Sequence, residues 1–127
     1  MITPDFNPAN EYKFLRYGRM SDDHQNPRSP DQQFSTVGEK VHRLRLPWLH
    51  LRDYRDAGIT GKFIKRRPGL TSMLADIRSG RVRPDLILLD TSERLGRSDE
   101  IAEIRRILRV RYGVLILTAD SNFADPT

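Results

Sequence analysis

The chain has 127 residues, a formal net charge of +5 and a sequence pI of about 10.0. This length predicts one domain, which can bury a core despite a mean hydropathy of -0.62. No apolar run is long enough for a membrane span and the N-terminus does not resemble a secretory signal, so we expect a cytoplasmic protein without a membrane partner. The absence of cysteine excludes disulfides, thiolate catalysis and cysteine-ligated zinc.

Arginine supplies most of the positive charge, and its planar guanidinium can grip a phosphate with two hydrogen bonds. Composition alone does not separate a phosphate-binding protein from the codon usage of a GC-rich genome. The three histidines, His24, His42 and His50, stand far apart with no carboxylate at ligand spacing. We therefore predict no metal site.

The first elements in chain order are an arm, a strand and a helix. Residues 1–11 show no periodicity and predict a flexible arm in front of a domain at 12–127. Residues 13–20 predict a strand that ends beside Ser21. Residues 29–46 predict a helix, because their first residues form a capping box with proline at the first helical position.

The rest of the chain continues this alternation, with a long polar loop from residue 55. The further elements are a strand at 48–54, a helix at 68–79, a strand at 85–90, a helix at 98–112 and a strand at 114–119. Such alternation predicts an α/β fold of three layers, α/β/α, around a mostly parallel sheet of four to five strands. Since the chain stops soon after its fourth strand, we expect a fragment of a longer protein.

Ligands of open parallel sheets bind outside the carboxyl ends of the strands, and three predicted loops leave that edge. These loops carry Arg19, Ser21 and Gln25, then Lys62, Lys65, Arg66 and Arg67, then Glu93, Arg94 and Arg97. Fixed guanidiniums stabilise the charge that develops when a phosphodiester is attacked, without needing a metal. Serine is a weak nucleophile unless it is activated, for which the arginine cluster or Glu93 is a candidate. The pattern predicts a phosphate site with Ser21 as its nucleophile.

Several motifs together resemble the catalytic domain of serine recombinases, the resolvase and invertase family. In family order they are YGRMS at 17–21, Gln25 with SPDQQ at 29–33, DAGITG at 56–61, RPGL at 67–70 and ERLGR at 93–97. Each motif is weak alone, but together they cover residues 13–119. The resemblance implies a resolvase-like catalytic domain of flavodoxin-like shape.

The resemblance also implies a mechanism in which Ser21 joins the 5′ phosphate of double-stranded DNA and frees a 3′ hydroxyl. Four guanidiniums would bind the scissile phosphate and an amide would support the site: Arg19, Arg67, Arg94, Arg97 and Gln33. No cofactor is implied, because the phosphoserine bond stores the energy for religation. Family members act as dimers and tetramers, so self-association of the full-length protein is expected.

Three departures from the family pattern affect these expectations. Glu93 stands where the family has aspartate, which puts the role of this carboxylate in doubt. The loop between Ser21 and Ser29 is longer than in small resolvases. The sequence of the predicted helix after Arg67 resembles large integrases and transposases slightly more than small resolvases. The family's dimerisation helix and DNA-binding domain lie beyond the end of this chain. We expect the isolated piece to bind DNA weakly and to recombine nothing.

Two other classes of function stay open. One is a catalytically degenerate domain that uses the fold for DNA contact or assembly. The other is a small-ligand domain of flavodoxin-like shape, which is disfavoured because neither glycine-rich phosphate motif occurs. Several charged side chains are predicted to have no part in catalysis. Lys62 and Lys65 are interpreted as general DNA-binding or surface charge, and Asp56 as a loop-shaping residue. A solvated helix face is predicted for Arg105, Arg106, Arg109 and Arg111. The sequence does not specify the DNA target, and it does not distinguish among integration, excision, inversion and transposition.

Overall fold

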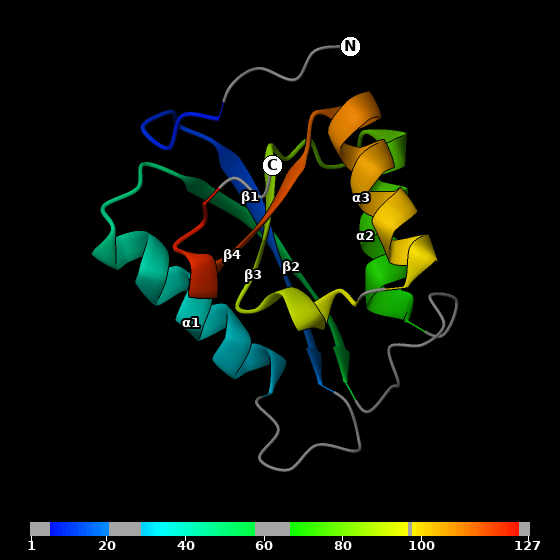
Figure 1. Ribbon diagram of the computed structural model, residues 1–127, viewed down its shortest axis with the longest axis horizontal. Helices are drawn as coiled ribbons and strands as arrows, with labels where there is room; N and C mark the ends of the chain where they lie inside the picture. Colours follow the sequence, from blue (N-terminus) through cyan, green and yellow to red (C-terminus); the bar gives the residue numbers. More distant parts are fainter. Residues whose placement is uncertain (1–5, 21–28, 58–66, 97, 125–127) are drawn as a thin grey trace.

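Four parallel strands form one sheet in the order β2-β1-β3-β4 (Figure 1). The computed structural model describes residues 6–20, 29–57, 67–96 and 98–124. The strands are β1 (Lys13–Met20), β2 (Leu49–Ala57), β3 (Leu86–Leu89) and β4 (Leu115–Thr118). The predicted α/β class with a mostly parallel sheet is confirmed.

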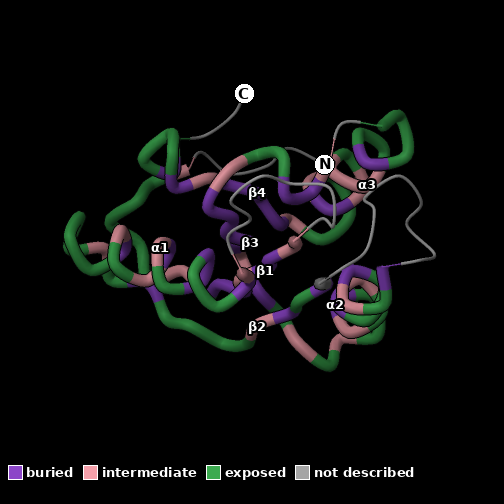
Figure 2. Tube along the Cα trace, turned by 90° about the horizontal axis from the view of Figure 1, so that it is seen from below, coloured by how far each residue is buried: buried purple, intermediate pink, exposed green. Residues whose placement is uncertain are grey.

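The helices lie on both faces of this sheet and complete three layers. They are α1 (Pro30–Arg43), α2 (Pro68–Ser79) and α3 (Asp99–Tyr112), with short 3₁₀ turns η2 (Ser92–Arg94) and η3 (Ala119–Ser121). Helix α1 covers one face, while α2 and α3 lie side by side on the other (Figures 1 and 2). The helix that follows β1 and the helix that precedes β3 lie on opposite faces of the sheet. Open α/β sheets bind ligands outside the carboxyl ends of the strands at such a point.

Local sequence explains where two of the helices begin and end. Ser29 caps α1 by accepting from the backbone N–H of Gln32, whose side chain accepts in return from the N–H of Ser29. The hydroxyl of Ser98 caps α3 by accepting from the backbone N–H of Ile101. Helix α3 ends at Gly113, which adopts a left-handed φ of 66°. The predicted capping box is confirmed.

Strand β2 is longer than predicted, and the loop predicted from residue 55 is wrong for residues 55–57. Parallel pairing with β1 continues to the end of both strands, where Arg19 lies opposite Asp56 and Met20 opposite Ala57. Backbone ladder bonds hold this polar stretch in the sheet even though its composition is typical of a loop. The extension carries Asp56 to the carboxyl edge of the sheet.

The strands divide the core into two clusters, one under each helical layer. Leu15 and Tyr17 of β1 face the α2 and α3 side, whereas Phe14 faces α1. All of β3 is buried, as Figure 2 shows for the middle of the molecule. Buried strands of this kind read as continuous apolar runs because helices cover both faces.

Part of the predicted N-terminal arm packs on the α1 side of the core. Phe6 stacks on Tyr12 with 5.5 Å between ring centroids, and the indole N–H of Trp48 donates to the carbonyl of Pro8 at 3.0 Å. Residues 1–5 lie outside the described residues, so the flexible arm and the boundary at residue 12 stay predictions. None of the helices that the structure describes is long and apolar enough to cross a membrane.

Candidate active site

Three of the predicted guanidiniums and the predicted amide meet at the carboxyl edge of the sheet. Arg19 is the last residue but one of β1, Arg67 precedes α2, and Arg94 lies in η2 after β3. Gln33 comes from the first turn of α1 and is fully buried. The carboxyl ends of β1 and β3 therefore bring together residues that are up to 75 positions apart in the chain.

Arg67 is completely buried. Its hydrogen bonds to other described residues all go to oxygen atoms. Its Nη1 donates to the carbonyl of Leu95 at 2.7 Å, and its Nη2 donates to the carbonyl of Arg94 at 3.0 Å. Nε and Nη2 also donate to the hydroxyl of Tyr17 at 3.2 and 2.9 Å. Arg67 thus ties the segment after β3 to strand β1 and places a positive charge beneath the edge.

Asp56, interpreted from sequence as a loop-shaping residue, is a buried part of this network. Its Oδ2 accepts from the Tyr17 hydroxyl at 2.7 Å and from the N–H of Leu70 at 3.0 Å, while its Oδ1 accepts from the N–H of Gly69 at 2.7 Å. The N–H groups of the first helical turn have no acceptor within the helix, so a carboxylate that accepts from them stabilises the positive end of α2. Asp56 therefore caps α2 from the end of β2, because Arg67 makes no side-chain cap.

The phenol of Tyr17 stays protonated well above the ordinary range. Burial raises its pKa, and this outweighs the charge of Arg67, which lowers it. The hydroxyl can then donate to Asp56 while accepting from Arg67. This chain of polar contacts links β1, β2 and the start of α2.

Each residue of the RPGL motif has a separate physical role. Arg67 makes the buried contacts above, and Pro68 opens the helix with a preset φ. A Cβ on Gly69 would collide with the backbone carbonyl of Arg55 and lie 3.0 Å from Oδ2 of Asp56. Leu70 is fully buried in the core. Glycine is needed here because α2 begins in direct contact with the end of β2.

Gln33 fixes the backbone of Arg19, two residues before Ser21. Its Oε1 accepts from the N–H of Arg19 at 2.9 Å and its Nε2 donates to the carbonyl of the same residue at 2.9 Å. Gly18 permits this approach, since a Cβ there would lie 3.1 Å from Oε1 of Gln33. Gln33 therefore holds the end of β1 in place, and its supporting role in a reaction stays a prediction.

The side chain of Arg19 contacts the backbone of η2. Its Nε donates to the carbonyl of Arg94 at 3.0 Å, and its Nη2 donates to the carbonyl of Glu93 at 3.1 Å. Burial lowers the pKa of Arg19, and the nearby charge of Arg67 lowers it further. The neighbouring positive charges of Arg19 and Arg67 favour the binding of an anion beside Arg19.

Arg94 pairs with a buried carboxylate that the sequence analysis missed. Its Nε donates to Oδ1 of Asp90 at 2.9 Å and its Nη2 donates to Oδ2 at 3.3 Å. Asp90 is 2% exposed and also accepts from the N–H of Thr91 at 2.8 Å. The available signal was an acidic residue directly after an apolar strand, since a buried carboxylate there needs a partner.

Glu93 lies differently from the pair beside it. Its side chain is exposed, and the hydroxyl of Thr91 lies 3.5 Å from its Oε1. Its backbone carbonyl, rather than its carboxylate, receives the bond from Arg19. The carboxylate in contact with Arg94 is therefore that of Asp90.

The remaining predicted residues lie outside the described residues. They are Ser21, Gln25, Lys62, Lys65, Arg66 and Arg97. Within the ranges that the structure does describe, no group of three His, Cys, Asp or Glu side chains is placed to hold a metal ion.

Three solved structures share this fold. The N-terminal catalytic domain of TP901-1 integrase aligns with a TM-score of 0.69 and 20% identity, over 87% of this chain and 78% of that one. The C-terminal catalytic domain of ISC1926 TnpA, an IS607-like serine recombinase, aligns at 0.67 and 18%, over 84% and 69%. A resolvase family site-specific recombinase from Streptococcus pneumoniae aligns at 0.68 and 22%, over 91% and 76%. At these identities the likeness shows the fold.

The search of curated proteins finds no match. The family model described as "Resolvase, N terminal domain" matches residues 14–127, which is most of the chain and includes every motif named above. The family expected from the motifs is confirmed, and this chain belongs to the resolvase N-terminal domain family of serine recombinases.

Proposed function

We propose that this chain is the catalytic domain of a site-specific recombinase that cleaves and rejoins double-stranded DNA through a phosphoserine at Ser21. The observation that carries the proposal is the convergence of Arg19, Arg67 and Arg94 at the edge where β1 ends, directly before Ser21. Membership of the resolvase family supports it.

The proposed reaction exchanges one phosphate ester for another. The Oγ of Ser21 attacks phosphorus, an Oγ–P bond forms, and the P–O3′ bond breaks. The serine proton ends on the departing 3′ oxygen, so the products are a 5′-phosphoserine and a 3′ hydroxyl. Attack by a 3′ hydroxyl reverses the step and restores the serine. The balance needs no water, oxidant or nucleotide.

The described side chains have distinct roles in this reaction. Arg19 uses Nε and Nη2 within the protein, and its Nη1 has no acceptor among the described residues, so we assign Nη1 to a phosphate oxygen. Arg67 acts from below as a buried charge and holds the carbonyls of Arg94 and Leu95 in place. Preorganised charge of this kind stabilises the transition state without reorganisation during the reaction.

Residues outside the described ranges complete the proposal. Arg97 would bind the scissile phosphate with Arg19, and Lys62, Lys65 and Arg66 would contact the DNA backbone. The full-length protein would act on DNA as a dimer or tetramer in the nucleoid, and the isolated domain would be inactive. The choice among integration, inversion, excision and transposition belongs to the whole protein.

Covalent trapping tests this function directly. The full-length protein is mixed with supercoiled DNA that carries the sequence flanking its gene, and the reaction is stopped with SDS. We expect a protein–DNA adduct with the wild type and none with Ser21→Ala. An adduct that persists in Ser21→Ala would exclude Ser21 as the nucleophile.

One observation favours the alternative of a degenerate domain. The guanidinium of Arg94 is engaged by Asp90, so it is not free for a phosphate in this conformation, and the carboxylate of Glu93 is exposed beside Thr91. Salt-sensitive DNA binding without any adduct would support this alternative. Glu93→Asp would then be the first variant to make, because it restores the family residue.

A further inference from the structure

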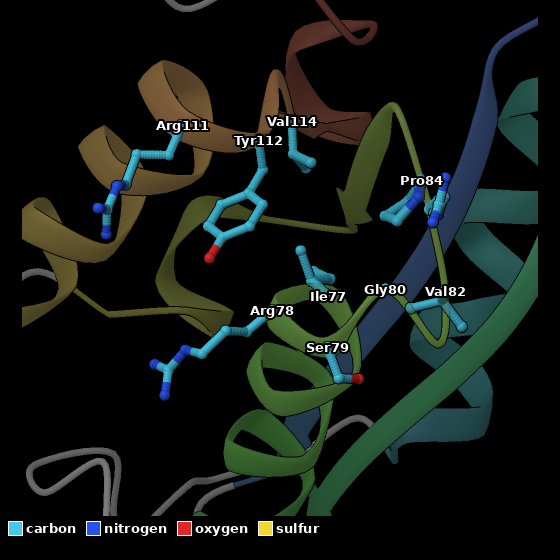
Figure 3. Close-up of a pocket in the computed structure, with 10 residues that line it drawn as sticks. Ile77, Arg78, Ser79, Gly80, Val82, Pro84, Arg111, Tyr112 and Val114 are labelled. Carbon is cyan, nitrogen blue, oxygen red and sulfur yellow. The ribbon is translucent and has the colours of Figure 1, made fainter.

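A groove follows the seam between α2 and α3, far from the carboxyl edge of the sheet. It consists of two cavities of about 460 and 190 Å³ that share the lining residues Ile77, Arg78, Arg111 and Tyr112. The smaller cavity lies between the two helices, and the larger one lies at their C-terminal ends beside Pro84 and Val114 (Figure 3). The groove therefore opens at the amino edge of the sheet, opposite the candidate active site.

The floor of the groove is apolar. Leu74, Ile104, Ile107 and Leu108 line the part between the helices. At its end Tyr112 is 38% exposed. Apolar side chains of another molecule that cover this floor would stabilise the complex, in proportion to the apolar area removed from water.

The rim of the groove carries unpaired positive charge. Arg78 and Arg111 line both cavities, and Arg83 lines the larger one. All three are exposed, and none makes an ion pair or a side-chain hydrogen bond with another residue that the structure describes. No acidic side chain of the described ranges lines either cavity.

Two other arginines near the groove do have acidic partners. Arg81 lies 3.6 Å from Asp76, and Arg106 donates to Glu103 on the outer side of α3. Arg78 and Arg111 also complement the negative ends of α2 and α3 as residues of the last turn. That explanation does not extend to Arg83, which follows α2 on the connection to β3.

We propose that this groove is a docking site for an acidic amphipathic helix of a protein partner. Apolar side chains at every third or fourth position of the helix would cover the floor, as in other helix-in-groove complexes. Its carboxylates would pair with Arg78, Arg83 and Arg111 at the rim. A DNA duplex fits this surface less well, because it offers phosphates without an apolar stripe. The proposal does not depend on DNA cleavage, which concerns the opposite edge of the sheet.

An NMR titration of this chain tests the proposal. The probe is a synthetic peptide of about 18 residues, long enough to form a helix, with leucines along one face and glutamates elsewhere. Two further probes are the same peptide with lysine in place of glutamate and a short DNA duplex. We expect only the acidic peptide to shift the amide signals of Leu74, Ile107 and Tyr112 in the ¹⁵N-labelled chain.

A matched pair of variants separates the groove from general charge attraction. Arg78→Glu/Arg111→Glu should weaken peptide binding at least about tenfold, because the rim would then repel the peptide. Arg43→Glu/Arg45→Glu changes two exposed arginines on the α1 side by the same charge and should bind like the wild type. A well-dispersed spectrum of each variant shows that its fold is retained.

Three outcomes would overturn the proposal. Equal binding of the acidic and basic peptides would show that charge does not select the partner. Shifts caused by the DNA duplex alone would identify a nucleic-acid site instead. Absence of groove shifts with the acidic peptide would show that the groove does not accept such a helix.

Discussion

Asp90 and Arg94 form a two-pronged ion pair from which solvent is almost excluded, with Nε–Oδ1 at 2.9 Å and side chains 1% and 10% exposed. The pair stands where β3 ends and η2 begins, so it sets the direction in which the ERLGR segment leaves the sheet. In this arrangement the carboxylate of Asp90 positions Arg94, whereas Glu93 contributes its backbone carbonyl to Arg19.

The first prediction concerns the loss of this carboxylate. Asp90→Asn keeps the shape of the side chain but leaves the charge of Arg94 buried without a counter-ion. We expect a loss of about 3–5 kcal/mol in the free energy of unfolding, which urea denaturation measures. Glu103→Gln breaks an exposed pair with Arg106 and serves as the control, with little change expected. Equal stability of Asp90→Asn and the wild type would contradict the structural role of the pair.

The second prediction concerns the contact between α2 and β2. Gly69→Ala places a methyl group against the backbone carbonyl of Arg55, which cannot rotate away. We expect a loss of about 1–3 kcal/mol as α2 shifts outward. Gly38→Ala adds the same methyl group within α1, 3.2 Å from the terminal Nη1 of Arg16, and should change stability less, since alanine favours a helix interior. A smaller effect at Gly69 than at Gly38 would refute the close contact.

The third prediction concerns the amide that holds Arg19. Gln33→Leu removes both hydrogen bonds to the Arg19 backbone and so loosens the residue next to the proposed nucleophile. In the full-length protein we expect the rate of covalent trapping to fall about 100-fold, because small displacements of reacting groups are costly. Gln32→Leu changes an exposed residue of the capping box of α1 and should retain most of the rate. Comparable rates for the two variants would remove Gln33 from the positioning of Arg19.

The fourth prediction concerns alkaline pH. Burial raises the pKa of Tyr54 from 10.0 to about 12, helped by its hydrogen bond to Asp76, and burial raises the pKa of Tyr17 as well. The folded chain thus holds protons that the unfolded chain releases above pH 10.0. The sign follows from linkage, so their stabilising effect is complete below pH 10.0 and decreases as the pH rises towards 12.

Urea unfolding across this pH interval measures the effect. Tyr54→Phe should show a shallower decrease in the free energy of unfolding than the wild type, since one of the two shifted phenols is gone. Parallel curves for the two proteins would mean that Tyr54 titrates alike in the folded and unfolded chains.

Local sequence chemistry is enough to predict the helix starts, the type of sheet and the family of this protein. The capping residues Ser29 and Ser98 mark helix starts because their hydroxyls satisfy nearby backbone N–H groups. Short apolar runs between helical segments require a parallel sheet covered on both faces, and β3 and β4 follow that rule. The order of the motifs predicts the family, and the alternation of strands and helices predicts the fold class.

Tertiary structure decided the partners of the charged side chains. Arg67 contacts Tyr17 across 50 positions and Arg19 contacts Arg94 across 75, and no local pattern specifies such pairs. The polar end of β2 became strand only because β1 was there to pair with it, and this brought Asp56 into the network. The same holds for the groove between α2 and α3, since its floor and its rim come from two helices that meet only in the folded chain.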